Sequence, residues 1–448
     1  MLSAPVMSQP VAQKIREAFR RFEKDPQLSH ASMSLYVVDA ASGKVIFDKN
    51  SKLGLAPAST QKVITSVTAF ELLGRDFRFQ TRFVIDRQSH SKLFVRGSGD
   101  PTFGSPRWDG TAAVGILKRL CDSIKKVSSR IQSVSVDRLE SRGSSIPDGW
   151  IWQDLGNYYG AGADALNWRE NQFDLLLRSG GQIGDSVIIL RSDPALYNYQ
   201  LKSYVTAAAK GSGDNAYIYF PLNAGKGFVT GTIPVNEKNF AVSGAFPDGA
   251  NQFVSELCAQ LTASGFSNPG PTIESDENLA GQNNSDIVFN YLSPPLDSII
   301  YWFNKKSINL YGEALIKTMG LQKKGTFSTD TGVSVIRDFW KKNHLDENEL
   351  NISDGSGLSP QNRVTTHAQV HILQYASHRE WFPLFFNALP EYNGMHMKSG
   401  TIKDVKGFCG YHRSKTGARY IFSFLVNNFN GSSAALVNKM YGVLDVLK

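Results

Sequence analysis

Apolar residues recur at helical spacing at both ends of the chain. Val11, Ile15, Phe19 and Phe22 lie three or four positions apart and predict an amphipathic helix. A second set near the C-terminus has similar spacing and predicts another amphipathic helix. It consists of Leu436, Met440, Val443, Leu444 and Leu447.

Strand patterns lie next to these predicted helices. Residues 33–38 and 45–48 predict a hairpin around Ser42-Gly43, and residues 407–412 and 419–426 predict two later strands. We expect one antiparallel sheet, built from both ends of the chain, with the terminal helices packed on it. The predicted fold class is α/β (α+β), with helices around an antiparallel sheet and smaller β-rich domains inserted.

The middle of the chain has a different pattern. Short strand-like runs such as residues 186–190 alternate with turns rich in Gly, Asn and Ser, among them residues 211–215. We therefore predict a main domain from residues 8–80 and 286–448, and an inserted domain over residues 81–285. A small β domain is expected to be nested near residues 186–242.

A third predicted helix carries the first candidate chemistry. Val63, Ile64, Val67, Phe70 and Leu73 recur at helical spacing, and Gly74 follows as a C-cap. Ser59 and Lys62 stand where this helix begins. Residues three apart share a helix face, so a desolvated Lys62 amine can take the Ser59 proton. Backbone N–H groups at the same end favour an oxyanion.

This pair by itself is weak evidence for a nucleophile. Ser89 with Lys92 and Ser123 with Lys126 have the same spacing, and a solvated surface pair is the ordinary interpretation of such a match.

Ser307 and Asn309 form a second candidate element. A hydroxyl and a carboxamide at this spacing can project together, so Ser307 can relay a proton and Asn309 can hold a substrate amide. The alternative is that Ser307 is an ordinary helix N-cap, because Leu310, Ala314, Leu315 and Met319 continue as an amphipathic helix.

The third element is Lys398-Ser399-Gly400-Thr401, at the end of a predicted strand. Lys398 supplies positive charge, Ser399 a hydroxyl for an anionic group, and Gly400 room for close backbone approach. The N–H groups of Thr401 and Ser59 together suit an oxyanion hole. A competing Lys415-Thr416-Gly417 falls in the predicted turn 413–417 and is interpreted as a turn only.

Composition agrees with a globular chain of two or three domains. The chain has 448 residues, 41% hydrophobic and 20% charged, with a formal charge of +8. No basic run or aromatic-basic motif supports nucleic-acid binding, and a basic surface suits an anionic cell wall. The three cysteines lack metal spacing and are too few for a disulfide framework, and Cys409 falls in a predicted core strand.

The order Ser-x-x-Lys, Ser-x-Asn, Lys-Ser-Gly resembles the signature of penicillin-recognising serine enzymes. Because 248 positions separate Ser59 from Ser307, the chain resembles the class C low-molecular-mass penicillin-binding proteins, the D-alanyl-D-alanine carboxypeptidase/endopeptidase family, whose members carry large insertions there. Other stretches similar to this family are residues 96–102, 293–296, 353–359 and 407–411. Ser399 stands where the family usually has threonine.

The resemblance implies a role for each matching residue. Ser59 would be the acylated nucleophile, Lys62 its base, Ser307 the proton relay and Asn309 the substrate-amide contact. Lys398 and Ser399 would clamp a terminal carboxylate. Asp154 resembles an acidic residue that reads the amino group of the stem-peptide diamino acid, the alternative being a loop aspartate that caps local backbone.

The implied activity is a serine DD-peptidase that acts on peptidoglycan stem peptides and is acylated by β-lactams. No metal, cofactor, nucleic acid or transmembrane segment is expected, and the oligomeric state is left open. We expect a periplasmic or extracellular location. Because peptidoglycan lies outside the cytoplasm and the N-terminus lacks the apolar region of a secretion signal, we expect that signal to have been removed.

Two other functions stay open. A β-lactamase needs a base that drives fast deacylation, and a non-catalytic penicillin-binding scaffold needs none of this chemistry. His367 and His371 have the spacing of a metal pair, but a solvated helix face is the favoured interpretation. Glu313 is expected to be a surface or packing residue, and Gly355-Ser356-Gly357 a loop bordering the cleft.

Overall fold

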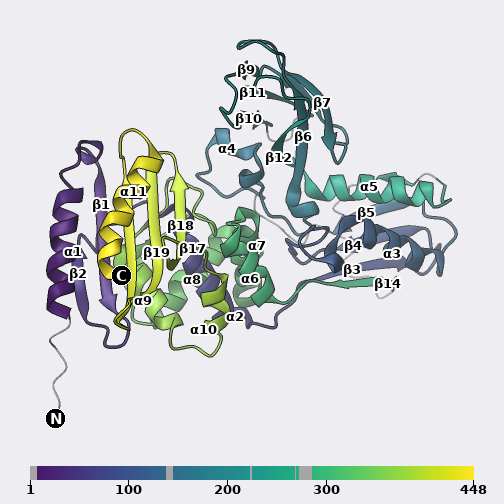
Figure 1. Cartoon of the computed structure of the whole chain (residues 1–448). Coiled ribbons are helices and arrows are strands. Elements are labelled where there is room, and N and C mark those ends of the chain that lie inside the picture. Colours follow the sequence, from purple (N-terminus) through teal and green to yellow (C-terminus); the bar gives the residue numbers. More distant parts are fainter. Residues whose placement is uncertain (1–7, 138–144, 222–224, 268, 272–284) are drawn as a thin grey trace. The chain divides into compact units, whose positions relative to one another are not determined.

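The computed structural model describes residues 8–137, 145–221, 225–267, 269–271 and 285–448 (Figure 1). The chain divides into two compact units. The first comprises residues 1–77, 295–325 and 329–448, and the second comprises residues 78–294 with 326–328. The domain boundaries expected from the sequence remain a prediction.

A six-stranded sheet in the order β17-β18-β19-β20-β1-β2 forms the centre of the first unit. All neighbouring strands are antiparallel. β1 from the N-terminal part pairs with β20 from the C-terminal part, so both ends of the chain build one sheet, as predicted. The strands are β1 (Ser32–Asp39), β2 (Val45–Lys49), β17 (Glu391–Tyr392), β18 (Met395–Ile402), β19 (Val405–Arg413) and β20 (Arg419–Asn427).

The two terminal helices pack on one face of this sheet. Alternate strand residues point to this face, among them Leu35, Phe422 and Phe424, and they meet Phe19 and Leu436 of the helices in one apolar cluster. The predicted terminal helices and their packing are therefore confirmed. The helices are α1 (Ser8–Phe22) and α11 (Ser433–Leu444).

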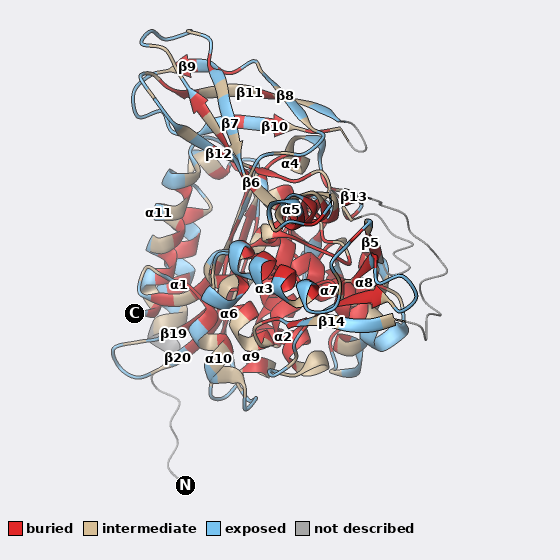
Figure 2. Cartoon of the chain, turned by 90° about the vertical axis from the view of Figure 1, so that its right-hand side faces the viewer, coloured by how far each residue is buried: buried red, intermediate tan, exposed pale blue. Residues whose placement is uncertain are grey.

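The other face of the sheet carries the helices that hold the candidate site. Every residue of α2 from Lys62 to Phe70 and of α7 from Asn309 to Gly320 is buried, and Figure 2 shows both helices in the colour of buried residues. Helices covered on all sides lie in the interior of a domain. The helices are α2 (Lys62–Leu73), α6 (Leu296–Lys305), α7 (Asn309–Lys324), α8 (Thr329–Lys342), α9 (Thr366–Ala376) and α10 (Phe382–Ala388).

The second unit contains several smaller sheets. One has the order β13-β5-β4-β3-β14 and packs with α3 and α5 around a core that includes Phe83, Phe103 and Phe253. Its elements are β3 (Gln80–Asp86), β4 (Lys92–Arg96), α3 (Ala113–Lys125), β5 (Ser133–Asp137), α5 (Gly249–Ala263), β13 (Gly270–Pro271) and β14 (Ser285–Leu292).

Two further sheets of this unit share another apolar core, which includes Phe173, Ile218 and Val229. One has the order β12-β6-β7, and in the other β11 pairs with β10, β8 and β9. Their strands are β6 (Gln172–Arg178), β7 (Ile188–Asp193), β8 (Gln200–Ser203), β9 (Thr206–Ala208), β10 (Asn215–Tyr219), β11 (Lys226–Pro234) and β12 (Phe240–Ala245).

Candidate active site

Ser59 and Lys62 meet at the start of α2. Ser59 lies in a short 3-10 turn, η2 (Ala58–Gln61), and Lys62 is the first residue of the α-helix that follows. Lys62 Nζ is 3.0 Å from Ser59 Oγ, and Lys62 is fully buried. The spacing of three residues therefore brings amine and hydroxyl into hydrogen-bonding distance.

The Lys62 amine also contacts two carbonyl oxygens. Its Nζ donates to Asn309 Oδ1 at 2.6 Å and to the backbone oxygen of Ser356 at 2.7 Å. A neutral amine has two N–H groups and one lone pair. When the carbonyl oxygens hold both N–H groups, the lone pair is left for the Ser59 hydroxyl.

The surroundings of this amine favour its neutral form. Burial lowers the pKa of Lys62 well below its ordinary value, and the positive charge of Lys398 lowers it further. Negative charge on Asp354 opposes this shift, as does Glu313 when its carboxyl is ionised. The Phe303 ring, whose centroid lies 5.6 Å from Lys62 Nζ, forms part of the apolar surroundings. A partly neutral lysine beside a serine hydroxyl can act as a general base.

Ser307 lies at a sharp corner between α6 and α7. Its φ of 57° is in the left-handed region, which a residue with a side chain adopts at a cost of about 1–3 kcal/mol, usually at functional sites. Ile308, not Ser307, is the N-cap of α7, and it makes no side-chain capping bond. The N-cap alternative for Ser307 is therefore wrong. Its hydroxyl instead accepts a hydrogen bond from Lys398 Nζ at 3.0 Å.

Lys398 lies inside β18, next to the turn of Ser59. It is buried, and its Nζ also donates to the backbone oxygen of Ser399 at 2.9 Å. Burial lowers the pKa of Lys398 to about 7, although Cys409 opposes the shift and Lys406 adds to it. Of the following residues, Ser399 is half-buried and Thr401 is exposed.

Gly400 permits β18 to approach η2. A Cβ at this position would lie 2.6 Å from the Pro57 carbonyl oxygen, 2.8 Å from Thr60 N and 2.9 Å from Ser59 N. Contacts this short are not tolerated, so only glycine fits. The sequence predicted close backbone approach at Gly400, and the structure identifies the turn that carries Ser59 as the backbone approached.

The competing Lys415-Thr416-Gly417 is a surface turn, as predicted. Ser414 N donates to the Ala418 oxygen at 2.8 Å and closes the hairpin between β19 and β20. Lys415 is exposed there, whereas Lys398 is buried beside Ser307. Cys409 of β19 is buried, as predicted, and all three cysteines are free.

The loop after β15 (Leu350–Asn351) lies beside the candidate site, as expected for Gly355-Ser356-Gly357, and it supplies a backbone contact to Lys62 that sequence patterns did not reveal. Asp354 Oδ1 accepts from Gly357 N at 2.7 Å and Oδ2 accepts from Ser359 N at 2.6 Å. Gln61, next to Lys62, donates its side-chain amide to Asp354 Oδ1 at 3.0 Å. These bonds hold the carbonyl of Ser356 against the Lys62 amine. The run Asp354-Gly355-Ser356-Gly357 predicts a tight loop, but it does not indicate which group the Ser356 carbonyl contacts.

Glu313 supports the same loop from α7. It is fully buried, and its two carboxylate oxygens accept from Gly355 N at 3.2 and 3.1 Å. Burial and the nearby Asp354 raise the pKa of Glu313 to about 8, so its carboxyl is mostly protonated at neutral pH. The alternative of a surface residue is wrong, because every residue of α7 from Asn309 to Gly320 is buried.

Asp154 belongs to the second unit, in α4 (Trp152–Leu155). No hydrogen bond or ion pair of its carboxylate occurs within the described parts of the chain, so the alternative of a backbone cap is not observed there. Burial raises the pKa of Asp154 to about 6. A half-buried carboxylate of this kind is suited to a cationic ligand.

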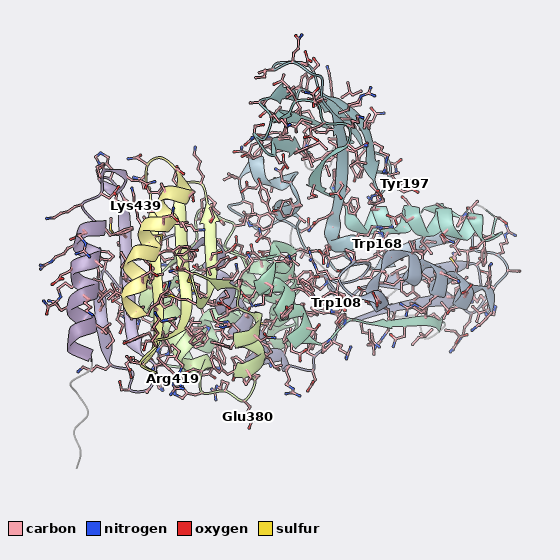
Figure 3. The ribbon with its side chains drawn as sticks, viewed as in Figure 1. Trp108, Trp168, Tyr197, Glu380, Arg419 and Lys439 are labelled. Carbon is pink, nitrogen blue, oxygen red and sulfur yellow. The ribbon has the colours of Figure 1, made fainter. Side chains whose placement is uncertain are left out.

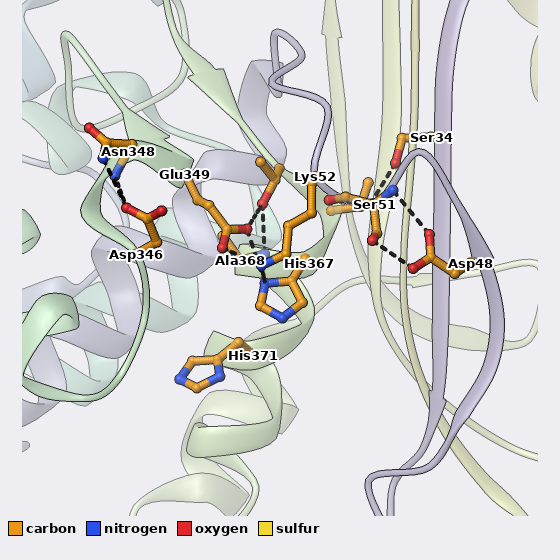
Figure 4. Close-up of polar contacts among 12 residues, drawn as sticks. Ser34, Asp48, Ser51, Lys52, Asp346, Asn348, Glu349, His367, Ala368 and His371 are labelled. Atoms are coloured by element: carbon orange, nitrogen blue, oxygen red, sulfur yellow. Dashed lines mark hydrogen bonds and ion pairs between the residues drawn. The ribbon is translucent and has the colours of Figure 1, made fainter.

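A separate polar network lies around Glu349 in the first unit (Figure 4). Lys52 Nζ is 2.6 Å from Glu349 Oε1, and His367 Nδ1 is 3.0 Å from Oε2. Burial works to raise the pKa of Glu349, but hydrogen bonds from His367, Lys52 and Thr365 outweigh it and lower that pKa to about 2. His367 is thus part of an ion-pair network and not of a solvated helix face.

The rings of His367 and His371 do stack, with centroids 6.3 Å apart. No group of three His, Cys, Asp or Glu side chains suited to a metal occurs in the part of the chain that the structure describes. In the same ranges, no helix has the length and apolar character needed to cross a membrane.

The arrangement of Lys62, Ser307 and Lys398 around Ser59, on helices that cover an antiparallel sheet, defines the class of penicillin-recognising serine peptidases. The model of the D-Ala-D-Ala carboxypeptidase 3 (S13) family matches residues 15–391. The chain therefore belongs to this family, and the prediction of a serine-type D-Ala-D-Ala carboxypeptidase is confirmed.

Individual relatives agree with this assignment. The chain is 24% identical to the D-alanyl-D-alanine carboxypeptidase of Actinomadura sp. (strain R39), over 96% of this chain and 84% of that protein. It is also 24% identical to the D-alanyl-D-alanine carboxypeptidase DacB of Haemophilus influenzae, over 86% of this chain and 83% of that protein.

A solved structure confirms the fold. The crystal structure of penicillin binding protein 4 (dacB) from Haemophilus influenzae matches with a TM-score of 0.78 at 19% identity, covering 98% of this chain and 99% of that one. At this level of identity the match bears on the fold alone.

Proposed function

We propose that this serine DD-peptidase cleaves the D-Ala-D-Ala end of peptidoglycan stem peptides through an acyl-enzyme on Ser59. One observation carries the assignment of roles: the buried Lys62 amine lies 3.0 Å from Ser59 Oγ, with both of its N–H groups directed at carbonyl oxygens. A surface serine–lysine pair would have a solvated, protonated lysine and no such partners.

The first step forms the acyl-enzyme. The Ser59 proton passes to Lys62 Nζ while Ser59 Oγ bonds to the carbonyl carbon of the penultimate D-Ala. The oxygen of that carbonyl becomes an oxyanion, which the N–H groups of Ser59 and Thr401 stabilise. Gly400 supports this part of the proposal, because it permits β18 to approach the backbone of Ser59.

The second step expels the terminal D-Ala. The proton taken by Lys62 reaches the leaving amine through the Ser307 hydroxyl, and the C–N bond breaks. Lys398 holds Ser307 at 3.0 Å and, with Ser399, attracts the terminal carboxylate. Asn309, whose Oδ1 contacts Lys62, also holds the substrate amide. Water then hydrolyses the ester and frees the shortened peptide.

The same chemistry permits cleavage of a cross-link when the leaving amine belongs to a second stem peptide. Asp154 is proposed to bind the amino group of the stem-peptide diamino acid, because its carboxylate is half-buried and acts as no backbone cap among the described residues. Because peptidoglycan lies outside the cytoplasm, the proposed location is the periplasm or the exterior of the cell.

Mass spectrometry with benzylpenicillin tests the assignment. We expect a stable adduct on Ser59 in the intact protein, none in Ser59→Ala, and release of D-Ala from a D-Ala-D-Ala peptide by the wild type only. Rapid hydrolysis of the antibiotic without an adduct would favour a β-lactamase. Neither adduct nor hydrolysis would favour a non-catalytic scaffold.

A further inference from the structure

One face of the small sheet formed by β10, β11 and β8 carries aromatic side chains. β10 pairs with β11 in antiparallel and β11 with β8 in parallel orientation. Ala216, Ile218 and Val229 point into the apolar core of this part of the second unit. Because side chains alternate along a strand, the residues between them project from the opposite face.

The strand register places three of these residues side by side. Tyr219 of β10 is opposite Phe228 of β11, and Phe228 is opposite Lys202 of β8. The rings of Tyr219 and Phe228 are stacked, with centroids 5.0 Å apart and an interplanar angle of 16°. Residues from three strands thus form one continuous surface.

An exposed aromatic residue extends each end of this surface. Trp152 of α4 lies 5.7 Å from Tyr219, and Tyr204, directly after β8, lies 6.2 Å from Phe228, measured between ring centroids. Lys202 Nζ is 4.8 Å from the centroid of the Tyr204 ring. Figure 1 shows α4 beside β10, the strand that carries Tyr219. We call Trp152, Tyr219, Phe228 and Tyr204, together with Lys202, the aromatic row.

Stability of the sheet does not account for this row. A stacked cross-strand pair such as Tyr219 and Phe228 stabilises a sheet. Tyr204 and Trp152, however, remain 56% and 46% exposed, so their side chains bury little apolar area and contribute little to the stability of the sheet. The hydroxyls of Tyr204 and Tyr219 have no hydrogen-bond partner among the described residues. Exposed contiguous aromatic rings on a soluble unit indicate a binding surface.

The chemistry of the row identifies a class of ligand. A pyranose ring has an apolar face of C–H groups and a rim of hydroxyls, so it can stack on an aromatic ring while its rim bonds to tyrosyl hydroxyls. A wholly apolar partner would leave these hydroxyls and the Lys202 ammonium buried without partners, which is unfavourable. Lys202 adds attraction for carboxylates along the polymer.

We propose that the aromatic row binds the glycan strand of peptidoglycan. This inference rests on the proposed function, because the stem peptides assigned there as substrates are attached to such a glycan. The row also begins on α4, the short helix that carries Asp154, so a glycan seated on it lies next to the residue proposed to read the peptide. The row would retain the enzyme on its polymeric substrate without taking part in bond cleavage.

Co-sedimentation with purified, peptide-free glycan strands tests the row. We expect the wild type to bind, Tyr204→Ala to bind at least about tenfold more weakly, and Tyr204→Phe to keep most of the affinity because the ring remains. Tyr197→Ala is the matched control, since Tyr197 is an exposed tyrosine of the same unit outside the row (Figure 3). It should bind like the wild type.

Benzylpenicillin acylation and cleavage of a short D-Ala-D-Ala peptide, measured on the same preparations, should be unchanged in Tyr204→Ala. Absence of glycan binding by the wild type, or equal binding by Tyr204→Ala, would overturn the glycan proposal. The glycan proposal would also be overturned if Tyr204→Ala changed self-association or binding to lipid vesicles and did not change glycan binding. Glycan binding without a penicilloyl adduct would instead overturn the proposed function and leave the row as a glycan-binding surface.

Discussion

Lys62 Nζ donates a hydrogen bond to the backbone carbonyl of Ser356 at 2.7 Å, although 294 positions separate the two residues. This bond and the one to Asn309 Oδ1 hold both N–H groups of a neutral Lys62. The remaining lone pair is available to Ser59, 3.0 Å away, and this geometry supports the proposed role of the serine as nucleophile.

Replacement of Lys62 by methionine should separate activity from stability. Loss of the base is expected to slow acylation by benzylpenicillin about 100- to 10,000-fold. The change removes the cost of burying an amine but leaves the Asn309 and Ser356 oxygens without their donor, so Tm should change by only a few degrees. Stopped-flow acylation and calorimetry measure the two effects.

Lys415→Met, in the exposed turn, is the control and should leave acylation unchanged. Equal losses of acylation rate in both variants would contradict the assignment of Lys62 as the base.

Lys398 should set a descending limb in the pH profile of acylation. Its pKa of about 7 means that the ammonium is present below this pH and lost above it, so attraction for a substrate carboxylate falls as pH rises. Lys398→Arg keeps the charge, because an arginine pKa exceeds about 12. We expect the descending limb to vanish in this variant even if the maximal rate falls. A limb that persists at the same pH would assign it to another group.

Gly400→Ala should disturb the contact between β18 and η2. A Cβ there would clash with Pro57 and with the N atoms of Ser59 and Thr60. We expect a loss of about 1–3 kcal/mol in the free energy of unfolding, together with slower acylation. Gly442→Ala is the matched control: nothing lies within 4 Å of its Cβ, and it stands inside α11, so it should stabilise by about 0.5–1 kcal/mol. Denaturant unfolding measures both.

Glu313 should make stability fall with rising pH. Its pKa is raised from 4.5 to about 8 in the folded protein, so the folded state binds a proton that the unfolded state has already released. The resulting stabilisation is full below pH 4.5 and is lost as pH rises through about 8. Gln resembles the protonated acid, so Glu313→Gln should match the wild type at pH about 4 and become progressively more stable relative to it above that pH.

Thermal unfolding across this pH range measures the difference between Glu313→Gln and the wild type. Glu380→Gln, a change at an exposed glutamate labelled in Figure 3, serves as the control and should show no such trend. A Tm difference for Glu313→Gln that does not vary with pH would show that Glu313 is ionised in the folded protein.

The sequence by itself determined what depends on local spacing. Ser59 and Lys62 are one helical turn apart, so their contact follows from η2 and α2 alone. The choice of Lys398 over Lys415 also followed locally, because alternating apolar residues predict the two strands on either side of the turn. Periodic apolar residues likewise predicted the terminal helices and the sheet that both ends of the chain build.

Only the tertiary structure decided what depends on packing between distant segments. The carbonyl of Ser356 is invisible in a residue pattern, since every residue has one, and only the folded loop directs it at Lys62. Glu313 looks like a surface residue until the burial of α7 is known, and His367 looks solvated until Glu349 is brought beside it. Burial, which shifts the pKa of Lys62 and Lys398, is a property of the packed unit and not of the residues themselves.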